Sequence, residues 1–127
     1  MDTTTSHQGT AYVTNNWGVD LASIYLRHRR SNDADKQESQ QWTVIPVDQK
    51  TTGMAFTYET GAASPFDYWW IKFVTVAGDT YDIKDDFYCS VEAKDNGIVN
   101  ISLNGDSDNM HVSFSKSSSC NVSVEKC

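Results

Sequence analysis

The chain has few of the features that mark membrane-spanning, helical or nucleic-acid-binding proteins. No apolar run approaches the roughly 18 residues of a membrane span, and no segment repeats its apolar residues with the 3.6-residue period of an amphipathic helix. The 10 Lys and Arg residues are outnumbered by 17 Asp and Glu, so the net charge is −7. Because binding to phosphates requires a cationic surface, we expect no nucleic-acid partner. The missing apolar run and the missing helical period predict no transmembrane segment and essentially no helix.

The start of the chain does not predict a targeting sequence. Residues 1–9 are polar and have neither the basic nor the apolar region of a signal peptide. We expect them to form a disordered lead-in to a single domain over residues 10–127. The protein is accordingly expected to be cytoplasmic, or released without a classical signal peptide.

Cysteine is scarce, occurring as Cys89, Cys120 and Cys127. Cys89 and Cys120 could pair, but a reducing compartment favours free thiols, with Cys89 packed as a small apolar residue. No CxxC or HxxxH spacing occurs, so we expect no structural zinc and no cofactor. The acidic segment 104–109 carries oxygen ligands of the kind that calcium takes; without the Glu and the helices of an EF-hand, a plain hairpin loop is the better interpretation.

The chain is rich in aromatic residues, and they are concentrated in residues 67–76, DYWWIKFVTV. Ten residues without Gly or Pro, dominated by aromatic and β-branched side chains, are typical of a long buried strand. Alternation places Trp69, Ile71 and Phe73 on one face. The pattern predicts a central strand of a sandwich, with one face in the core.

Shorter segments of strand character recur at intervals of about ten residues, with turn residues between them. Residues 30–41 are polar and predict a solvated loop, and Pro46 indicates that the strand before it lies at an edge. The expected fold is an all-β, antiparallel β-sandwich of jelly-roll type with about eight to ten strands. Besides 67–76, the strands are expected at 10–15, 23–29, 41–47, 52–58, 80–83, 87–93, 98–103, 111–115 and 121–125.

Four of these segments resemble one family: residues 13–16 (VTNN), 23–31 (SIYLRHRRS), 67–70 (DYWW) and 86–89 (DFYC). The family comprises small proteins first noted as up-regulated in long-lived insulin-signalling mutants of nematodes, with fungal and bacterial relatives. The resemblance implies a β-sandwich without enzymatic activity that tends to form dimers. More distantly, the fold it implies is similar to that of the aegerolysins, small acidic proteins that recognise membrane lipids.

The aromatic residues outside the expected core are the best candidates for a binding site, because exposed indole and phenol rings beside carboxylates and amides bind sugars and lipid headgroups. We therefore expect a non-enzymatic module that recognises a glycan or a lipid headgroup. The expected ligand-binding residues are Asn15, Asn16, Trp17 and Asp20 in one turn, and Asp67, Tyr68 and Trp70 in the central strand.

Other interpretations remain open from the sequence. Trp70 could pack in a homo- or heterodimer interface, which would make the protein a structural or assembly partner. An enzyme using Cys89 is a third interpretation, although nothing places a His beside it. The basic run His28, Arg29 and Arg30 could hold a phosphate, but ion pairs with some of the many acidic residues are favoured.

Overall fold

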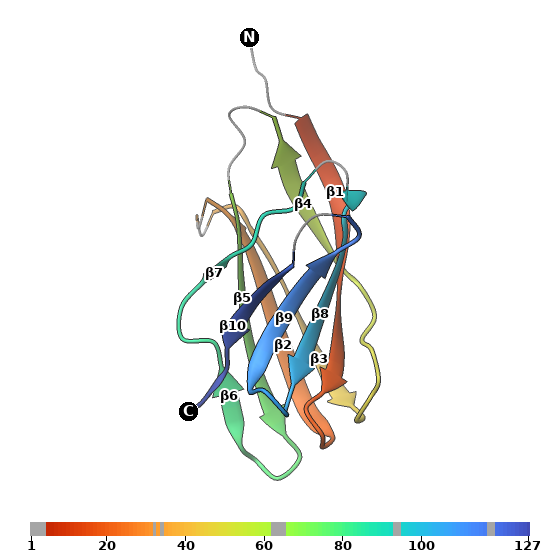
Figure 1. Cartoon of the computed structure of the whole chain (residues 1–127), viewed down its shortest axis with the longest axis vertical. Coiled ribbons are helices and arrows are strands. Elements are labelled where there is room, and N and C mark those ends of the chain that lie inside the picture. Colours follow the sequence, from red (N-terminus) through yellow and green to blue (C-terminus); the bar gives the residue numbers. More distant parts are fainter. Residues whose placement is uncertain (1–4, 32, 34, 62–65, 93–94, 117–118) are drawn as a thin grey trace.

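The computed structural model describes the chain except for residues 1–4, 32, 34, 62–65, 93–94 and 117–118, and it is a β-sandwich (Figure 1). The first sheet has five strands in the order β10-β9-β8-β1-β4, and the second has six in the order β11-β6-β5-β2-β3 with β7 paired to β5. No helix in the described part of the chain is long and apolar enough to cross a membrane. The expected all-β sandwich is confirmed.

Most expected strands are present, with shifted ends. The five-stranded sheet is built from β1 (Thr5–Asn16), β4 (Met54–Thr60), β8 (Ile98–Asn104), β9 (Asn109–Phe114) and β10 (Cys120–Ser123). The six-stranded sheet is built from β2 (Leu21–Arg30), β3 (Gln37–Ile45), β5 (Asp67–Thr75), β6 (Thr80–Asp82) and β11 (Glu125–Lys126), together with β7 (Phe87–Tyr88). One pairing differs from an all-antiparallel sandwich, because β1 and β8 run parallel.

The expectation of a central strand at 67–76 is confirmed by β5, which lies between β2 and β6. Trp69, Ile71 and Phe73 are all fully buried between the sheets, as the alternation predicts. The Trp69 Nε1 atom donates to the Cys89 carbonyl at 2.8 Å, which satisfies the one polar atom of the indole. Lys72 points to the opposite face and is exposed.

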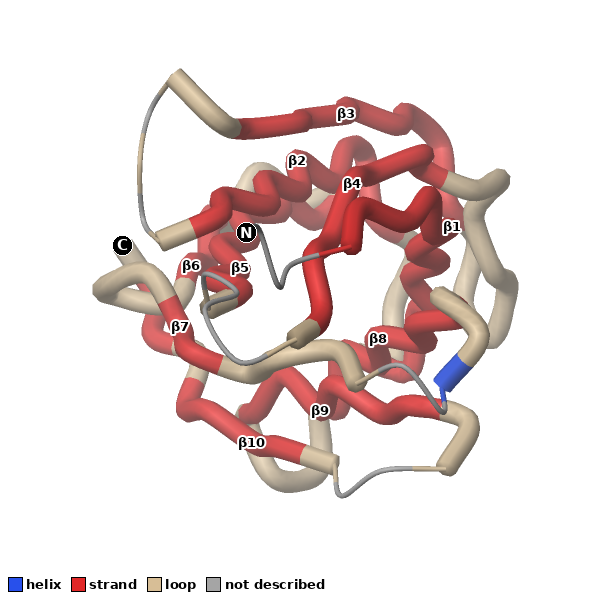
Figure 2. The backbone as a smooth tube through the Cα atoms, turned by 90° about the horizontal axis from the view of Figure 1, so that it is seen from above, coloured by secondary structure: helices blue, strands red, loops and turns tan. Residues whose placement is uncertain are grey.

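Both open edges of the sandwich are bridged, so the backbone forms a nearly closed ring when seen from above (Figure 2). At one edge the C-terminal segment changes sheets: Ser123 pairs with β9, whereas Glu125 pairs with β6. At the other edge β3 and β4 are linked through side chains. The Trp42 Nε1 atom donates to Thr52 Oγ1 at 3.0 Å, and Thr57 N donates to Glu38 Oε2 at 3.1 Å.

Three expectations about local structure are wrong. Residues 5–9 are not disordered but belong to β1 and pair with β4; residues 1–4 lie outside the described residues. Residues 37–41 are not loop but the first half of β3, a largely exposed edge strand whose polar residues carry no apolar alternation. In the expected strand 87–93 only Phe87–Tyr88 forms a ladder, and residue 93 is outside the described part.

Val44 shows why strict alternation fails near the end of β3. Trp42 and Ile45 are both buried although two residues lie between them, where strict alternation would place one. Val44 has φ 56°, a left-handed conformation that is strained for a β-branched residue, and its side chain is 78% exposed. The adjoining part of β2 is irregular as well, because its register against β5 shifts between Leu21 and Ser23. The alternation is reset at this irregularity, so that Trp42 and Ile45 both reach the core.

The preference for free thiols is also wrong, because Cys89 and Cys120 form a disulfide. The bond ties the segment after β7 to β10, across the two sheets. Cys89 is fully buried, as expected from its apolar character, and Cys127 is free and exposed.

Candidate functional site

The residues expected to bind a ligand fall into two groups at different places in the sandwich. Trp17 and its neighbours lie in the turn between β1 and β2, beside the end of β5, because Leu21 pairs with Thr75. Asp67 begins β5 at the opposite end, paired with Arg30. Since eight residues of extended strand span roughly 27 Å, the structure does not bring the two groups together.

Asn15 holds the β1–β2 turn in place rather than facing solvent. Its side chain is fully buried, and Nδ2 donates to the carbonyls of Val19 and Ile45 at 2.9 Å each. The Asn15 Oδ1 atom accepts from Trp17 N at 3.0 Å. All three bonds stabilise local backbone, so this amide has a structural role.

Trp17 is half-buried, and its indole packs on the core. The ring lies 4.8 Å from Phe73 and 4.9 Å from Tyr81, centroid to centroid. A hollow of about 260 Å³ lies beside Trp17 and Tyr81. Part of the indole therefore faces this hollow, but most of its contacts are with the protein itself.

The two remaining residues of this turn are exposed and hydrogen-bonded. Asn16 Nδ2 donates to Ser102 Oγ at 2.8 Å. The Asp20 carboxylate accepts from Val47 N at 2.9 Å, and the Asp20 carbonyl accepts from Val76 N at 3.2 Å. Asp20 thus joins three neighbouring loops at this end of the sandwich.

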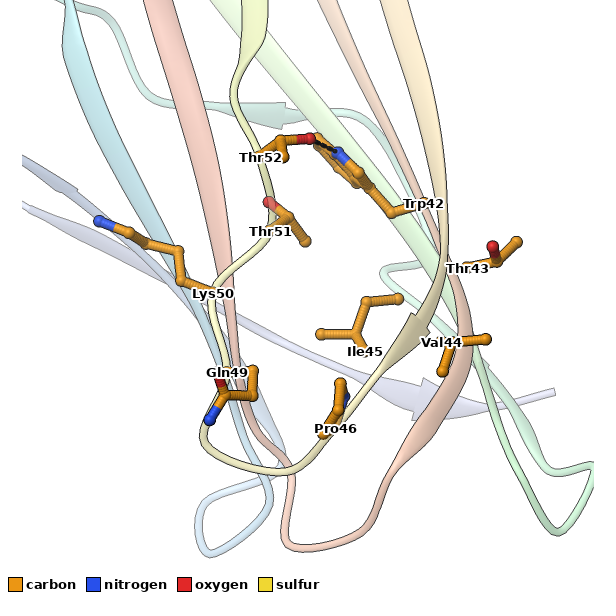
Figure 3. A pocket seen from close by; sticks show the side chains of 9 residues that line it. All are labelled: Trp42, Thr43, Val44, Ile45, Pro46, Gln49, Lys50, Thr51 and Thr52. Carbon is orange, nitrogen blue, oxygen red and sulfur yellow. Dashed lines mark hydrogen bonds between the residues drawn. The ribbon is translucent and has the colours of Figure 1, made fainter.

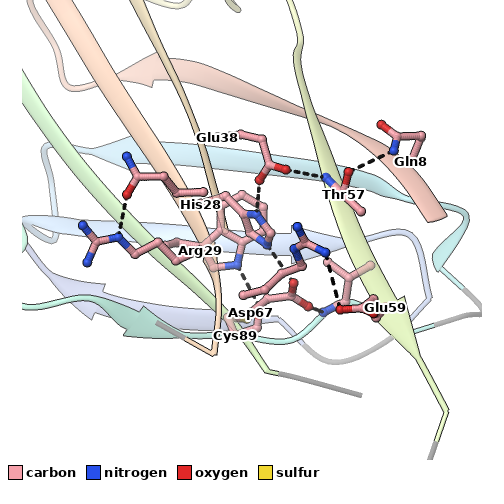
Figure 4. Close-up of polar contacts among 12 residues, drawn as sticks. Gln8, His28, Arg29, Glu38, Thr57, Glu59, Asp67 and Cys89 are labelled. Atoms are coloured by element: carbon pink, nitrogen blue, oxygen red, sulfur yellow. Dashed lines mark hydrogen bonds and ion pairs between the residues drawn. The ribbon is translucent and has the colours of Figure 1, made fainter. Parts of the chain in front are cut away.

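Asp67 is buried beside His28 in the core, where the two form an ion pair (Figure 4). Asp67 Oδ1 lies 2.7 Å from His28 Nε2, and Oδ2 accepts from Val91 N at 2.9 Å. On the other side of the imidazole, Nδ1 lies 2.8 Å from Glu38 Oε1. The ring also packs between Phe56 and Trp69, 4.8 and 4.7 Å away. The carboxylate of Asp67 therefore belongs to the interior.

The two carboxylates determine the charge of this histidine. Burial by itself lowers the pKa of His28, but the hydrogen bonds and negative charges of Asp67 and Glu38 outweigh that effect and raise the pKa above the ordinary 6.5. Through these two contacts His28, in β2, links β3 and β5 inside the sandwich. Glu38 extends the link to β4 through Thr57 N.

The other members of the basic run are paired as well. Arg30 Nη1 lies 3.5 Å from Glu59 Oε2, and Arg29 Nη1 lies 3.6 Å from Asp86 Oδ2. Arg27 Nη2 donates to Asp86 Oδ1 at 2.7 Å. The predicted ion pairs between this basic run and acidic residues are confirmed.

Tyr68 and Trp70 lie on the outer face of the six-stranded sheet, and both are half-buried. Trp70 contacts Tyr25 edge to face at 5.8 Å, and the Arg27 guanidinium lies 4.9 Å from the Trp70 ring. Tyr68 lies opposite Tyr88, which also contacts Phe66, with centroid distances of 5.8 and 5.1 Å. Together these rings form an aromatic surface across β2, β5 and β7.

A hollow adjoins these rings on the same face. It has a volume of about 320 Å³ and is lined by Ser23, Tyr25, Gln41, Lys72 and Val74. The pairing explains why residues so far apart in sequence meet there: Gln41 lies opposite Tyr25 in β3, and Lys72 lies opposite Tyr25 in β5. We call the lining residues together with Trp70 the outer-face site.

A third hollow, of about 220 Å³, lies at the bridged edge between the end of β3 and the segment leading to β4 (Figure 3). Ile45 and Thr51 point into it from opposite walls, and Lys50, next to Thr51, also lines it. The Lys50 ammonium lies 4.6 Å from the Tyr12 ring on the outside of the first sheet. No group of three or more His, Cys, Asp and Glu that could hold a metal occurs in the described residues.

The sequence analysis predicted one residue of the outer-face site, Trp70. It missed those that the neighbouring strands contribute, Ser23 and Tyr25 from β2 and Gln41 from β3. The phase of 23–29 places Tyr25 outward, which was a usable signal. Gln41 belonged to a segment without apolar alternation, so nothing in the sequence placed it next to Tyr25. In comparisons with known proteins, no family model and no curated protein matches this chain.

Proposed function

We propose that the protein is a non-enzymatic binding module that recognises a glycan at the outer-face site. The observation that carries the proposal is the hollow beside the Tyr25–Trp70 pair. Aromatic rings bind the apolar faces of sugars, while the Gln41 amide, the Ser23 hydroxyl and the Lys72 ammonium can bond hydroxyls around them. The volume of about 320 Å³ lies in the range of small-ligand sites, roughly 300–1,000 Å³.

The environment of two reactive side chains supports a role without catalysis. The Cys89 sulfur is bonded to Cys120 and fully buried, so it is not a thiolate nucleophile. His28 has both ring nitrogens engaged by carboxylates in the core, which leaves neither nitrogen to act as a base on a ligand. We propose as well that the protein works in an oxidising compartment, because the disulfide would persist there.

An assembly role is the second candidate, and a specific observation favours it. Phe66 and Tyr88 are 55% and 49% exposed and touch each other next to Tyr68. Aromatic residues of this kind are enriched in protein interfaces. A homodimer would bury them together with Trp70, and the glycan would then lose its access.

Calorimetric titration of the purified protein against a panel of soluble oligosaccharides tests the proposal. Gln41→Ala should weaken binding of a hit at least fivefold, and Trp70→Ala should abolish it. Gln40→Ala is the matched control, because this neighbour on the same strand is exposed but does not line the hollow. Equal effects of the two glutamine variants would contradict the proposal.

Sedimentation at several protein concentrations separates the assembly candidate. A monomer that binds an oligosaccharide supports the glycan site. A tight dimer that Trp70→Ala converts to monomers would replace the glycan site by the assembly role. Binding to zwitterionic lipid vesicles but to no oligosaccharide would assign the same surface to a lipid headgroup instead.

A further inference from the structure

The outer face of the five-stranded sheet carries amide and hydroxyl groups where the opposite sheet carries charges. Its outward positions can be read from the alternating burial of the strands and from their register. The outward positions of β4, on the far side of β1, form a separate margin that includes Glu59. On β1 from Thr10 onward, and on β8, β9 and β10, none of the outward positions holds Asp, Glu, Lys or Arg. They are Thr10, Tyr12, Thr14, Asn16, Ile98, Asn100, Ser102, Asn104, Asn109, His111, Ser113, Asn121 and Ser123. We call this surface the uncharged face.

The side chains of the uncharged face are ordered by bonds to one another. Asn16 Nδ2 donates to Ser102 Oγ at 2.8 Å, and Ser102 Oγ donates to Asn104 Oδ1 at 2.6 Å. Asn104 Nδ2 donates in turn to Asn109 Oδ1 at 3.0 Å, in the next strand. A continuous chain of side chains thus crosses β1, β8 and β9, so their donors and acceptors are held in fixed positions.

The chain of bonds leaves hydrogen-bonding capacity directed outward. Asn100 is exposed, and its side-chain amide has no partner among the described residues; only its carbonyl is used, by Ser113 Oγ at 3.1 Å. In the row toward β10, His111 Nδ1 donates to Asn121 Oδ1. Each Asn amide contributes donors and an acceptor side by side, which is the pattern that a sugar hydroxyl matches.

The absence of charge is specific to this face and does not reflect a lack of charged residues, because 21% of the chain is Asp, Glu, Lys or Arg. The outer face of the other sheet has Arg27, Arg29 and Lys72 at equivalent outward positions. Charged residues approach the uncharged face only at its margins in the described structure. Lys50 lies over Tyr12 at one side, where β4 also carries Glu59. Asp106 and Asp108 lie in the loop between β8 and β9.

We propose that the uncharged face binds a neutral polysaccharide chain. An uncharged partner has no counterions to release and is not repelled by the net charge of −7. A face without charged side chains therefore fits a neutral ligand. Repeated rows of donors and acceptors, one on each strand at about 4.8 Å spacing, fit a polymer with repeating hydroxyls. A second copy of the protein fits less well, because this face lacks the apolar and aromatic centre of a stable interface.

Retention on suspended cellulose, curdlan and chitin, measured by depletion of the protein from solution, tests this inference. We expect retention on at least one of these polymers, unchanged between 0.05 and roughly 1 M NaCl because no charge pairs are screened. Asn100→Glu should reduce retention at least tenfold. Ser39→Glu is the matched control: it places the same charge at an exposed outward position of β3 on the other sheet, and it should leave retention intact.

The variants also separate this site from the outer-face site. Retention lost in Trp70→Ala but kept in Asn100→Glu would overturn the uncharged-face proposal and leave the outer-face proposal standing. No retention on any of the three polymers, or retention that falls steeply with salt, would overturn it as well. Thermal melting of Asn100→Glu, expected to match that of Ser39→Glu, shows that the loss comes from the surface and not from unfolding.

Discussion

The disulfide between Cys89 and Cys120 should account for a large part of the stability of this domain. It closes a loop with a sequence separation of 31 residues. The entropy that such a loop removes from the unfolded chain corresponds to about 3.5–4 kcal/mol. Since small domains unfold with about 5–15 kcal/mol in total, reduction should bring the protein close to the limit of folding.

Cys120→Ser is the variant of choice, because Cys120 is only partly buried whereas Cys89 is fully buried. A hydroxyl at position 89 would add a desolvation cost to the loss of the bond. With urea m-values of about 1–3 kcal/mol per M, the midpoint of Cys120→Ser should fall by roughly 1–4 M. Cys127→Ser, which removes the free and exposed thiol, should leave the midpoint unchanged.

The assay is urea unfolding followed by intrinsic fluorescence, with and without dithiothreitol. Reductant should shift wild type to the midpoint of Cys120→Ser and should leave that variant where it is. Thiol titration of the unreduced, denatured protein should find the Cys127 thiol alone. Titration of all the cysteines, together with a midpoint that reductant does not move, would refute the reasoning.

Three further predictions concern the interior and the end of the sandwich. The pKa of His28 is raised in the folded state. The stabilising effect of the protonated imidazole is therefore complete below pH 6.5 and is lost as the pH rises through the folded-state pKa. Urea midpoints should fall from pH 6 to 9, and His28→Gln should abolish that fall. A slope that persists in this variant would assign it to another group. Trp17→Ala should lower the free energy of unfolding by about 2–4 kcal/mol, because the indole packs on Phe73 and Tyr81; an unchanged melting temperature would return Trp17 to the candidate ligand residues. Gly105→Ala should cost about 1–3 kcal/mol, since a Cβ there would lie 2.1 Å from the Trp17 carbonyl oxygen; a neutral effect in chemical unfolding would show that the two turns separate easily.

The sequence predicted the features that depend on local periodicity. The alternation of residues 67–76 correctly placed Trp69 and Phe73 in the core and Trp70 outside it. Features that depend on pairing between distant segments were missed. Residues 37–41 fold as a strand because β2 offers a partner edge, and their own polar side chains give no indication of it.

The candidate site was predicted only in part, for a related reason. Asn15 and Asp67 were expected to bind a ligand because exposed amides and carboxylates do so. Both are instead buried and saturated by partners far away in sequence, Ile45 for Asn15 and His28 for Asp67. A polar residue beside an aromatic one has the same local pattern in both situations, and only the tertiary contacts distinguish them.

Mapping of a bound oligosaccharide by amide chemical-shift changes tests the central claim, a glycan site on the outer face of the six-stranded sheet. The account predicts saturable changes centred on Tyr25, Gln41 and Lys72, together with a shift of the Trp70 indole signal. Changes centred on the β1–β2 turn around Trp17, or the absence of any change with a broad panel of oligosaccharides, would contradict it.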